Sequence, residues 1–124
     1  MVAVDTSTWI AYMAGSNGAD IDLLIDGLRS NKVALPPVVV AELFSQPNLP
    51  RAHRMALQEL PLLDPLPDYW LRAGETRSRL LSRKLRARLA DSLIAQSCID
   101  HDIALITRDR DFRHFAKHCG LKLA

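Results

Sequence analysis

Short apolar runs alternate with amphipathic segments along the whole chain, and this alternation limits the fold more than any other feature. The runs with the length of buried strands are Met1–Val4, Val33–Leu35, Leu62–Leu63, Ile103–Thr107 and Leu121–Leu123. The segments between them have helical spacing, as in the apolar stripe of Ile21–Leu28. Strands that alternate with helices predict an α/β fold, with a parallel sheet covered on both faces.

The size and composition of the chain fit one compact domain. It has 124 residues, of which 48% are hydrophobic and 24% charged. No apolar run approaches the roughly 18–20 residues that span a bilayer, and the N-terminus lacks the features of a secretory signal. Cys98 and Cys119 are too few for a disulfide framework. We therefore expect one domain over residues 1–124, no membrane segment and a cytoplasmic location.

The segment Val38–Phe44 fits two structures. Its valine run favours a strand. Alternatively, Pro37 can occupy the first position of a helix, whose apolar stripe then includes Val39 and Leu43. We adopt the helix, which places Glu42 at the edge of the stripe, where it can face a cleft. Further helices are expected over Arg51–Leu60, from about Asp68 with a break near Gly74 or Ser82 left open, from Asp91, and over Asp111–His118.

Four carboxylates follow or flank these apolar segments. Asp5 and Asp109 come just beyond predicted strands, Glu42 lies in an apolar helix, and Asp91 lies at a helix start. Ligands of parallel sheets gather at the carboxyl ends of the strands, so we expect these acids to converge. Converging carboxylates repel one another unless a cation neutralises them. Oxygen ligands without Cys or His select Mg²⁺ or Mn²⁺, which can activate water for attack on a phosphodiester.

Each acid also fits an ordinary structural role. Asp5 and Asp91 suit helix caps, and Glu42 suits a solvated helix position. Asp109 and Asp111 suit a turn or a cap before the last helix. The joint order of the first four acids favours a site over these separate roles. For Asp111, a fifth carboxylate, the cap is favoured over assistance to a second ion.

Four segments carry a resemblance to a known family: Val4–Ile10, Val40–Leu43, Ala90–Ala95 and Ala104–Phe112. With them, the chain resembles PIN-domain proteins of the VapC toxin type over its full length. The resemblance implies a three-layer fold with a central five-stranded parallel sheet. It implies that Asp5, Glu42, Asp91 and Asp109 are the catalytic and metal-binding residues at one edge of that sheet. Supporting roles fall to Ser7, Thr107 and Asp111.

The same resemblance implies an Mg²⁺- or Mn²⁺-dependent endoribonuclease, the toxin of a toxin–antitoxin pair and a homodimer. One metal would be held mainly by Asp5, Asp91 and Asp109, and a second near Glu42. The cognate antitoxin is expected to present an arginine or lysine to these acids. Its apolar residues would pack on the helices around Trp9 and Glu42, where the proline-rich segment 47–67 can leave a groove.

A basic stretch stands apart from the acids. Seven basic residues and one acid, Glu75, lie between Arg72 and Arg88, although the net charge of the chain is only +2. On an ideal helix one face carries Arg72, Arg79, Arg83 and Arg86. Such a face is either merely solvated or binds phosphates, and the nearby acidic site favours RNA binding.

Rival activities lack their required residues. An aspartyl phosphatase needs a second aspartate where Ser7 stands, and a phospho-accepting domain needs a lysine where the late strand ends in Thr107-Arg108. The chain has no phosphate-binding Gly-x-x-x-x-Gly-Lys loop. A non-catalytic PIN-like module that binds RNA or protein remains the open alternative.

Overall fold

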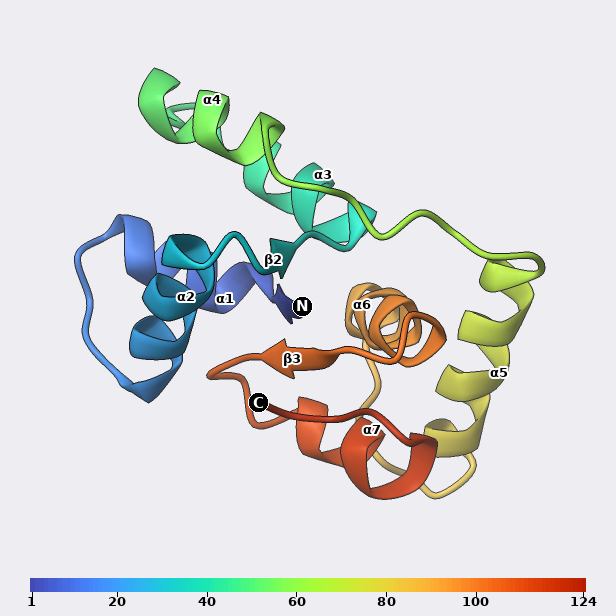
Figure 1. Cartoon of the computed structure of the whole chain (residues 1–124). Helices are drawn as coiled ribbons and strands as arrows, with labels where there is room; N and C mark the ends of the chain where they lie inside the picture. Colours follow the sequence, from blue (N-terminus) through green and yellow to red (C-terminus); the bar gives the residue numbers. More distant parts are fainter.

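A computed structural model describes residues 1–124 as seven helices around a small parallel sheet (Figure 1). The elements in chain order are β1 (Val2–Val4), α1 (Thr6–Met13), α2 (Ala19–Arg29), β2 (Val33–Ala34), α3 (Pro37–Phe44), α4 (Arg51–Gln58), α5 (Tyr69–Leu81), α6 (Leu89–Asp100), β3 (Ala104–Ile106) and α7 (Phe112–Cys119). None of these helices combines the length and the apolar character that crossing a bilayer requires.

The sheet has the order β2-β1-β3, and both strand pairs are parallel. Isolated parallel bridges continue it at each edge, joining Leu35 to Leu62 and Leu105 to Leu123. The expected five strands are thus three strands and two single-residue bridges. At one edge, prolines at positions 61 and 65 flank the bridge and cannot donate to a ladder. At the other edge, the Leu121 N–H donates to the Phe115 carbonyl and so belongs to the end of α7.

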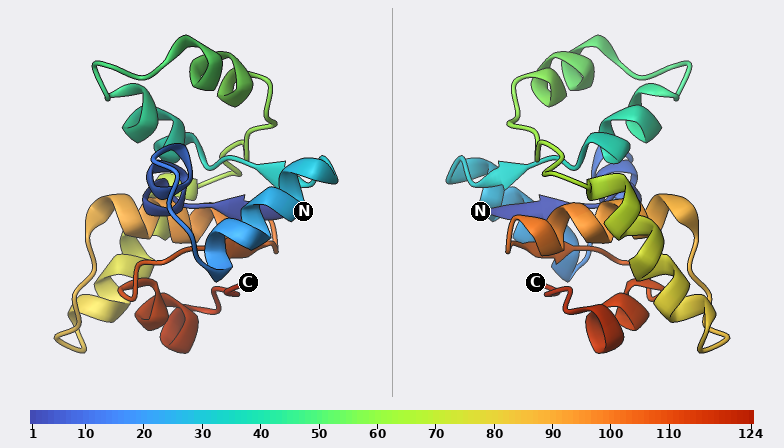
Figure 2. Two further views of the ribbon diagram at one scale, coloured as in Figure 1. Left: turned by 90° about the vertical axis from the view of Figure 1, so that its left-hand side faces the viewer. Right: turned by 90° about the vertical axis from the view of Figure 1, so that its right-hand side faces the viewer.

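Helices cover both faces of the sheet. Figures 1 and 2 show α1 and α2 on one side and α5 and α6 on the other, with α3 and α4 beyond the β2 edge. The central residues Ala3 and Val4 of β1 and Leu105 of β3 are fully buried, as the apolar runs predict. Glycine at position 27 lets α2 approach the sheet, because a Cβ there would lie 2.8 Å from Val33 Cγ2. This packing fixes where the strand ends, and the acids beyond them, point.

The ambiguous segment is a helix, as we expected. Pro37 occupies the first turn of α3, and Val39 and Leu43 face the core. The basic region is not one helix, because α5 passes Gly74 unbroken but ends at Leu81, and residues 82–88 form a turn, in which Lys84 is left-handed, and a loop. Helix α6 begins at Leu89, two residues before Asp91.

Candidate metal centre

The carboxyl ends of β1 and β3 border a cleft of about 210 Å³. Its lining includes all four acids of the predicted site, Asp5, Glu42, Asp91 and Asp109, together with Thr6, Ser7, Ile10, Arg88 and Ile94. The topology explains the convergence, because β1 and β3 are adjacent and parallel, and Asp5 and Asp109 follow their ends. Helices α3 and α6 contribute Glu42 and Asp91.

Asp5 is almost fully buried, with 3% of its surface exposed. Its Oδ1 accepts from the Thr8 backbone N–H at 3.1 Å, and its Oδ2 accepts from Thr107 Oγ1 at 2.7 Å. Ser7 Oγ lies within 3.0 Å of both oxygens. Burial raises the pKa of Asp5, and the hydrogen bonds oppose that rise. Asp5 therefore caps α1 and also lines the cleft.

Glu42 is half-buried in α3 and is held by α1. Thr6 Oγ1 donates to Glu42 Oε1 at 2.6 Å, which joins two helices that begin far apart in the sequence. The Thr6 hydroxyl is a contact that sequence reasoning missed, because a bond between residues 36 positions apart leaves no local sequence pattern. The bond leaves Oε2 of Glu42 free to bind a ligand in the cleft.

Asp91 lies in the first turn of α6, where it does not cap the helix. Its Oδ2 is buried and has no hydrogen-bond partner. Burial, and then the neighbouring charge of Asp109, raise the pKa of Asp91 to about 6, while Arg88 opposes the rise. A buried carboxylate oxygen without a partner is costly, so this atom indicates that the site accommodates a cation.

Asp109 and Asp111 form one turn after β3. The Asp109 N–H donates to Thr107 Oγ1 at 3.0 Å, and Asp109 Oδ1 accepts from the Asp111 N–H at 2.9 Å. Asp111 occupies the cap position of α7, but its side chain makes no capping hydrogen bond. Its carboxylate instead lies near Asp91 and Asp109, and 3.6 Å from Arg86 Nε. The preferred cap role of Asp111 is therefore wrong.

The acids fit a hard divalent cation. One carboxylate oxygen each from Asp91, Asp109 and Asp111 lie within 4.8 Å of one another. Asp5 lines the same cleft and contributes to the raised pKa of Asp91. The donors are all oxygen, and Asp91 Oδ2 lacks any other partner. This donor set suits Mg²⁺ or Mn²⁺ better than Zn²⁺.

The basic residues are placed less uniformly than an ideal helix face suggested. The Arg72 guanidinium is bound to Asp100 and to the Pro67 carbonyl, so the protein itself offsets its charge. Arg79 is exposed near the end of α5, and Arg83 is exposed in the turn after it, so the two do not share one helix face. Arg88, which the sequence-based set omitted, lines the cleft. Its position three residues before Asp91, about one helical turn, was the signal that could have identified it.

Comparison with known families now identifies the fold. The family model described as PIN domain matches residues 2–118. The chain belongs to the PIN-domain family. PIN domains are generally nucleases and typically use divalent metals, in keeping with the carboxylate cluster of this chain.

Solved structures share the PIN fold over nearly the whole chain. VapBC2 from Rickettsia felis, bound to a DNA fragment from its promoter, has 21% identity and a TM-score of 0.74, covering 100% of this chain and 98% of that one. DNA-bound VapBC from Salmonella typhimurium has 16% identity and a TM-score of 0.70, covering 100% and 98%. FitAcB from Neisseria gonorrhoeae has 19% identity and a TM-score of 0.68, covering 99% and 96%.

Proposed function

We propose that this PIN domain is a metal-dependent endoribonuclease, and that it is the toxin of a toxin–antitoxin pair. The observation that carries the nuclease proposal is the unpartnered, buried Oδ2 of Asp91 beside Asp109 and Asp111. The toxin assignment is supported by the VapBC complexes that share the fold.

Asp5, Asp91 and Asp109 would hold Mg²⁺ or Mn²⁺, which when bound supplies an acidified water and offsets the charge that develops on a phosphodiester. The protein's own residues orient the ligands. Ser7 and Thr107 fix both oxygens of Asp5, and Thr6 fixes one oxygen of Glu42. Glu42, held in this way, would be available to bind a second ion, which would supply further charge neutralisation.

Metal binding is tested without activity by thermal unfolding. Mn²⁺ at about 100 times its dissociation constant should stabilise the folded state by about 2.7 kcal/mol, because the unfolded chain has no such site. RNA cleavage should require Mg²⁺ or Mn²⁺ and stop in excess chelator. Undiminished cleavage in chelator would contradict the metal mechanism. Metal binding without any cleavage of RNA would instead support the non-catalytic module.

RNA would approach over the end of α5 and the loop that follows it. Arg79, Arg83 and Arg86 remain candidates for phosphate binding, and Arg88 joins them because it lines the cleft. We leave Arg72 out, because its guanidinium is engaged by Asp100. Phosphate contacts of this kind supply affinity that depends on salt and not on sequence.

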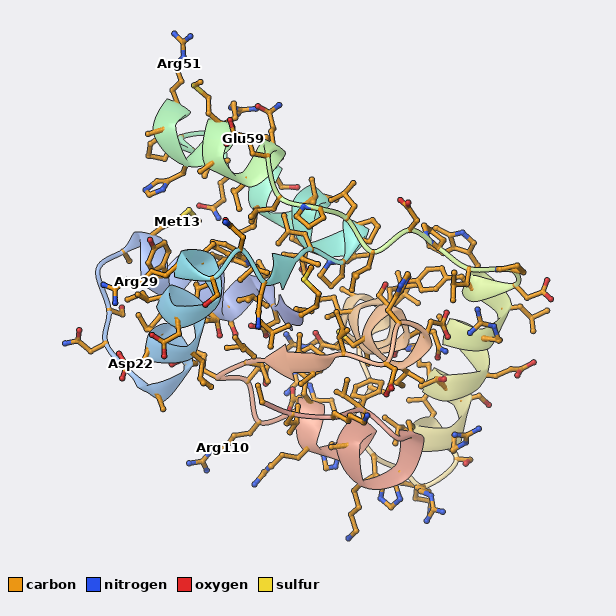
Figure 3. All side chains as sticks on the ribbon, in the orientation of Figure 1. Met13, Asp22, Arg29, Arg51, Glu59 and Arg110 are labelled. Atoms are coloured by element: carbon orange, nitrogen blue, oxygen red, sulfur yellow. The ribbon has the colours of Figure 1, made fainter.

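Replacement of Arg79, Arg83 and Arg86 together by glutamine should weaken RNA binding and leave the metal affinity unchanged. Three lost phosphate contacts lower the slope of log affinity against log salt by about 2 for single-stranded RNA. A matched control replaces Arg29, Lys32 and Arg51 by glutamine, which removes the same amount of positive charge. Arg29 and Arg51 lie on α2 and α4 (Figure 3). An equal loss of affinity in both variants would show that only net charge matters.

An antitoxin would be recognised by two features of the surface. The acidic cleft suits an arginine or lysine, as the sequence led us to expect. Beside it, two connected hollows between α1 and α4 share Met13 and His53, and Figure 3 shows Met13 in this region. Their lining is mostly apolar.

A homodimer is also part of this proposal. Trp70 and Leu71 at the start of α5 are 65% and 61% exposed. Large apolar side chains exposed on one helix are typical of protein contacts, which supports an association between two copies.

A further inference from the structure

An ion pair outside the cleft joins the turn after β3 to the first turn of α2. Arg108 Nε donates to Asp20 Oδ2 at 2.8 Å, and Arg108 Nη2 donates to Asp20 Oδ1 at 3.0 Å. The same Nη2 also donates to the Asn17 carbonyl at 3.2 Å. A bidentate pair between two planar groups fixes their relative orientation as well as their distance.

Asp20 has a further partner in α1. The fully buried Thr8 donates from Oγ1 to Asp20 Oδ2 at 3.0 Å, while its backbone N–H donates to Asp5 Oδ1. On the other side of the ion pair, Arg108 directly follows Thr107, which donates to Asp5 Oδ2. These contacts form a closed ring that runs from Asp5 through Thr8, Asp20, Arg108 and Thr107 back to Asp5.

We propose that Asp20 is a positioning residue for the metal centre, acting on Asp5 through Thr8 and Arg108. This inference rests on the proposed metal-dependent function. Asp20 does not line the cleft. It instead binds Thr8 and Arg108, and so holds the two segments that donate to opposite oxygens of Asp5. Through Arg108 it also anchors the turn that carries Asp109. Partners of this kind orient metal ligands, and their loss weakens metal binding although they never touch the ion.

The local backbone is adapted to this pair. Gly18 has a φ of +153°, and a Cβ there would lie 2.6 Å from Asp20 Oδ1 and 3.2 Å from Arg108 Nη2. Any side chain at this position would push the two groups apart. The hydrogen bond from Arg108 also lowers the pKa of Asp20, because the guanidinium favours the charged carboxylate.

The test compares Asp20→Asn with Asp22→Asn. Both residues lie in the first turn of α2, and Asp22 is exposed on its outer side (Figure 3). The two variants lose the same charge near the same helix end, so the control accounts for the loss of charge itself. Mn²⁺ alone is titrated while thermal unfolding is followed. We expect Asp20→Asn to raise the half-saturating Mn²⁺ concentration about 10-fold or more, and Asp22→Asn to leave it unchanged.

Arg108→Lys gives a second measurement that does not disturb the core. This variant keeps the positive charge but loses the bidentate contact with Asp20, so its affinity for Mn²⁺ should also fall. The proposal is wrong if Asp20→Asn and Arg108→Lys only lower the metal-free melting temperature and titrate with Mn²⁺ like the wild type. If the wild type itself shows no Mn²⁺-dependent rise, the proposed metal centre fails, and this inference fails with it.

Discussion

Asp91→Asn is expected to abolish RNA cleavage and to stabilise the metal-free protein at neutral pH. Asparagine keeps the size of the side chain but removes the charge that would hold the cation beside Asp109. We expect cleavage to fall by at least about 100-fold, more than the loss of an outer partner causes. The gain in stability arises because the substitution removes a partly buried charge that faces other carboxylates.

The sign of the stability effect follows from the pKa. Asp91 has a folded-state pKa of about 6, above its ordinary value of 3.8, so the folded state holds this proton more tightly. Metal-free stability should therefore fall as pH rises from about 4 through about 6, and level off above that. Solvent screens this partly exposed group, so we expect an effect of about 1 kcal/mol, or roughly 3 °C in Tm.

The control for this prediction is Asp102→Asn, which changes an exposed aspartate in the turn before β3 and should affect neither property. Asp111→Asn should reduce cleavage, but less than Asp91→Asn, because Asp111 is offset by Arg86 and does not line the cleft. Both quantities are measured by cleavage of labelled RNA and by thermal unfolding in chelator over pH 4–8. Equal loss of cleavage from Asp91→Asn and Asp111→Asn would show that the two acids contribute alike.

Local sequence patterns predicted most of the fold because they depend on local physics. The apolar runs gave β1, β2 and β3, and Pro37 with the stripe around Val39 gave α3. The two outer strands were overestimated, because proline and the end of α7 take the backbone groups that a longer ladder needs. Such competition for hydrogen bonds is decided by tertiary structure.

The candidate site was predictable where chain order and strand direction determine position. Asp5 and Asp109 follow adjacent parallel strands, which brings them to the same edge of the sheet. Their proximity can therefore be predicted without knowledge of any side-chain contact. The partners of the acids were not predictable. The bond from Thr6 to Glu42 and the ring through Asp20 join residues 36 and 88 positions apart along the chain. Asp111 was misjudged because an aspartate before a helix usually caps it, and here the turn directs the side chain towards Asp91.

Expression of this chain alone is expected to arrest bacterial growth, and Asp5→Asn should remove the toxicity. A nuclease with an open cleft would cut cellular RNA, whereas Asp5→Asn removes the charge of the acid that Ser7 and Thr107 hold in place. Co-expression of the protein encoded by the adjacent reading frame should restore growth. Growth curves after induction, with immunoblots for soluble protein, measure all three conditions.

A substitution in the hollow between α1 and α4 separates silencing from catalysis. Ala56 lines this hollow from α4 and is exposed, so Ala56→Arg should fold normally. Its charge would block an apolar partner while the acidic cleft stays intact, so growth arrest should persist despite co-expression. Met55→Arg is the matched control, because Met55 is 52% exposed on the same helix and outside the lining. If the adjacent protein rescues both variants equally, the antitoxin binds elsewhere. A soluble, folded chain that is harmless when expressed alone would contradict the toxin proposal and favour an RNA-processing enzyme of narrow substrate range.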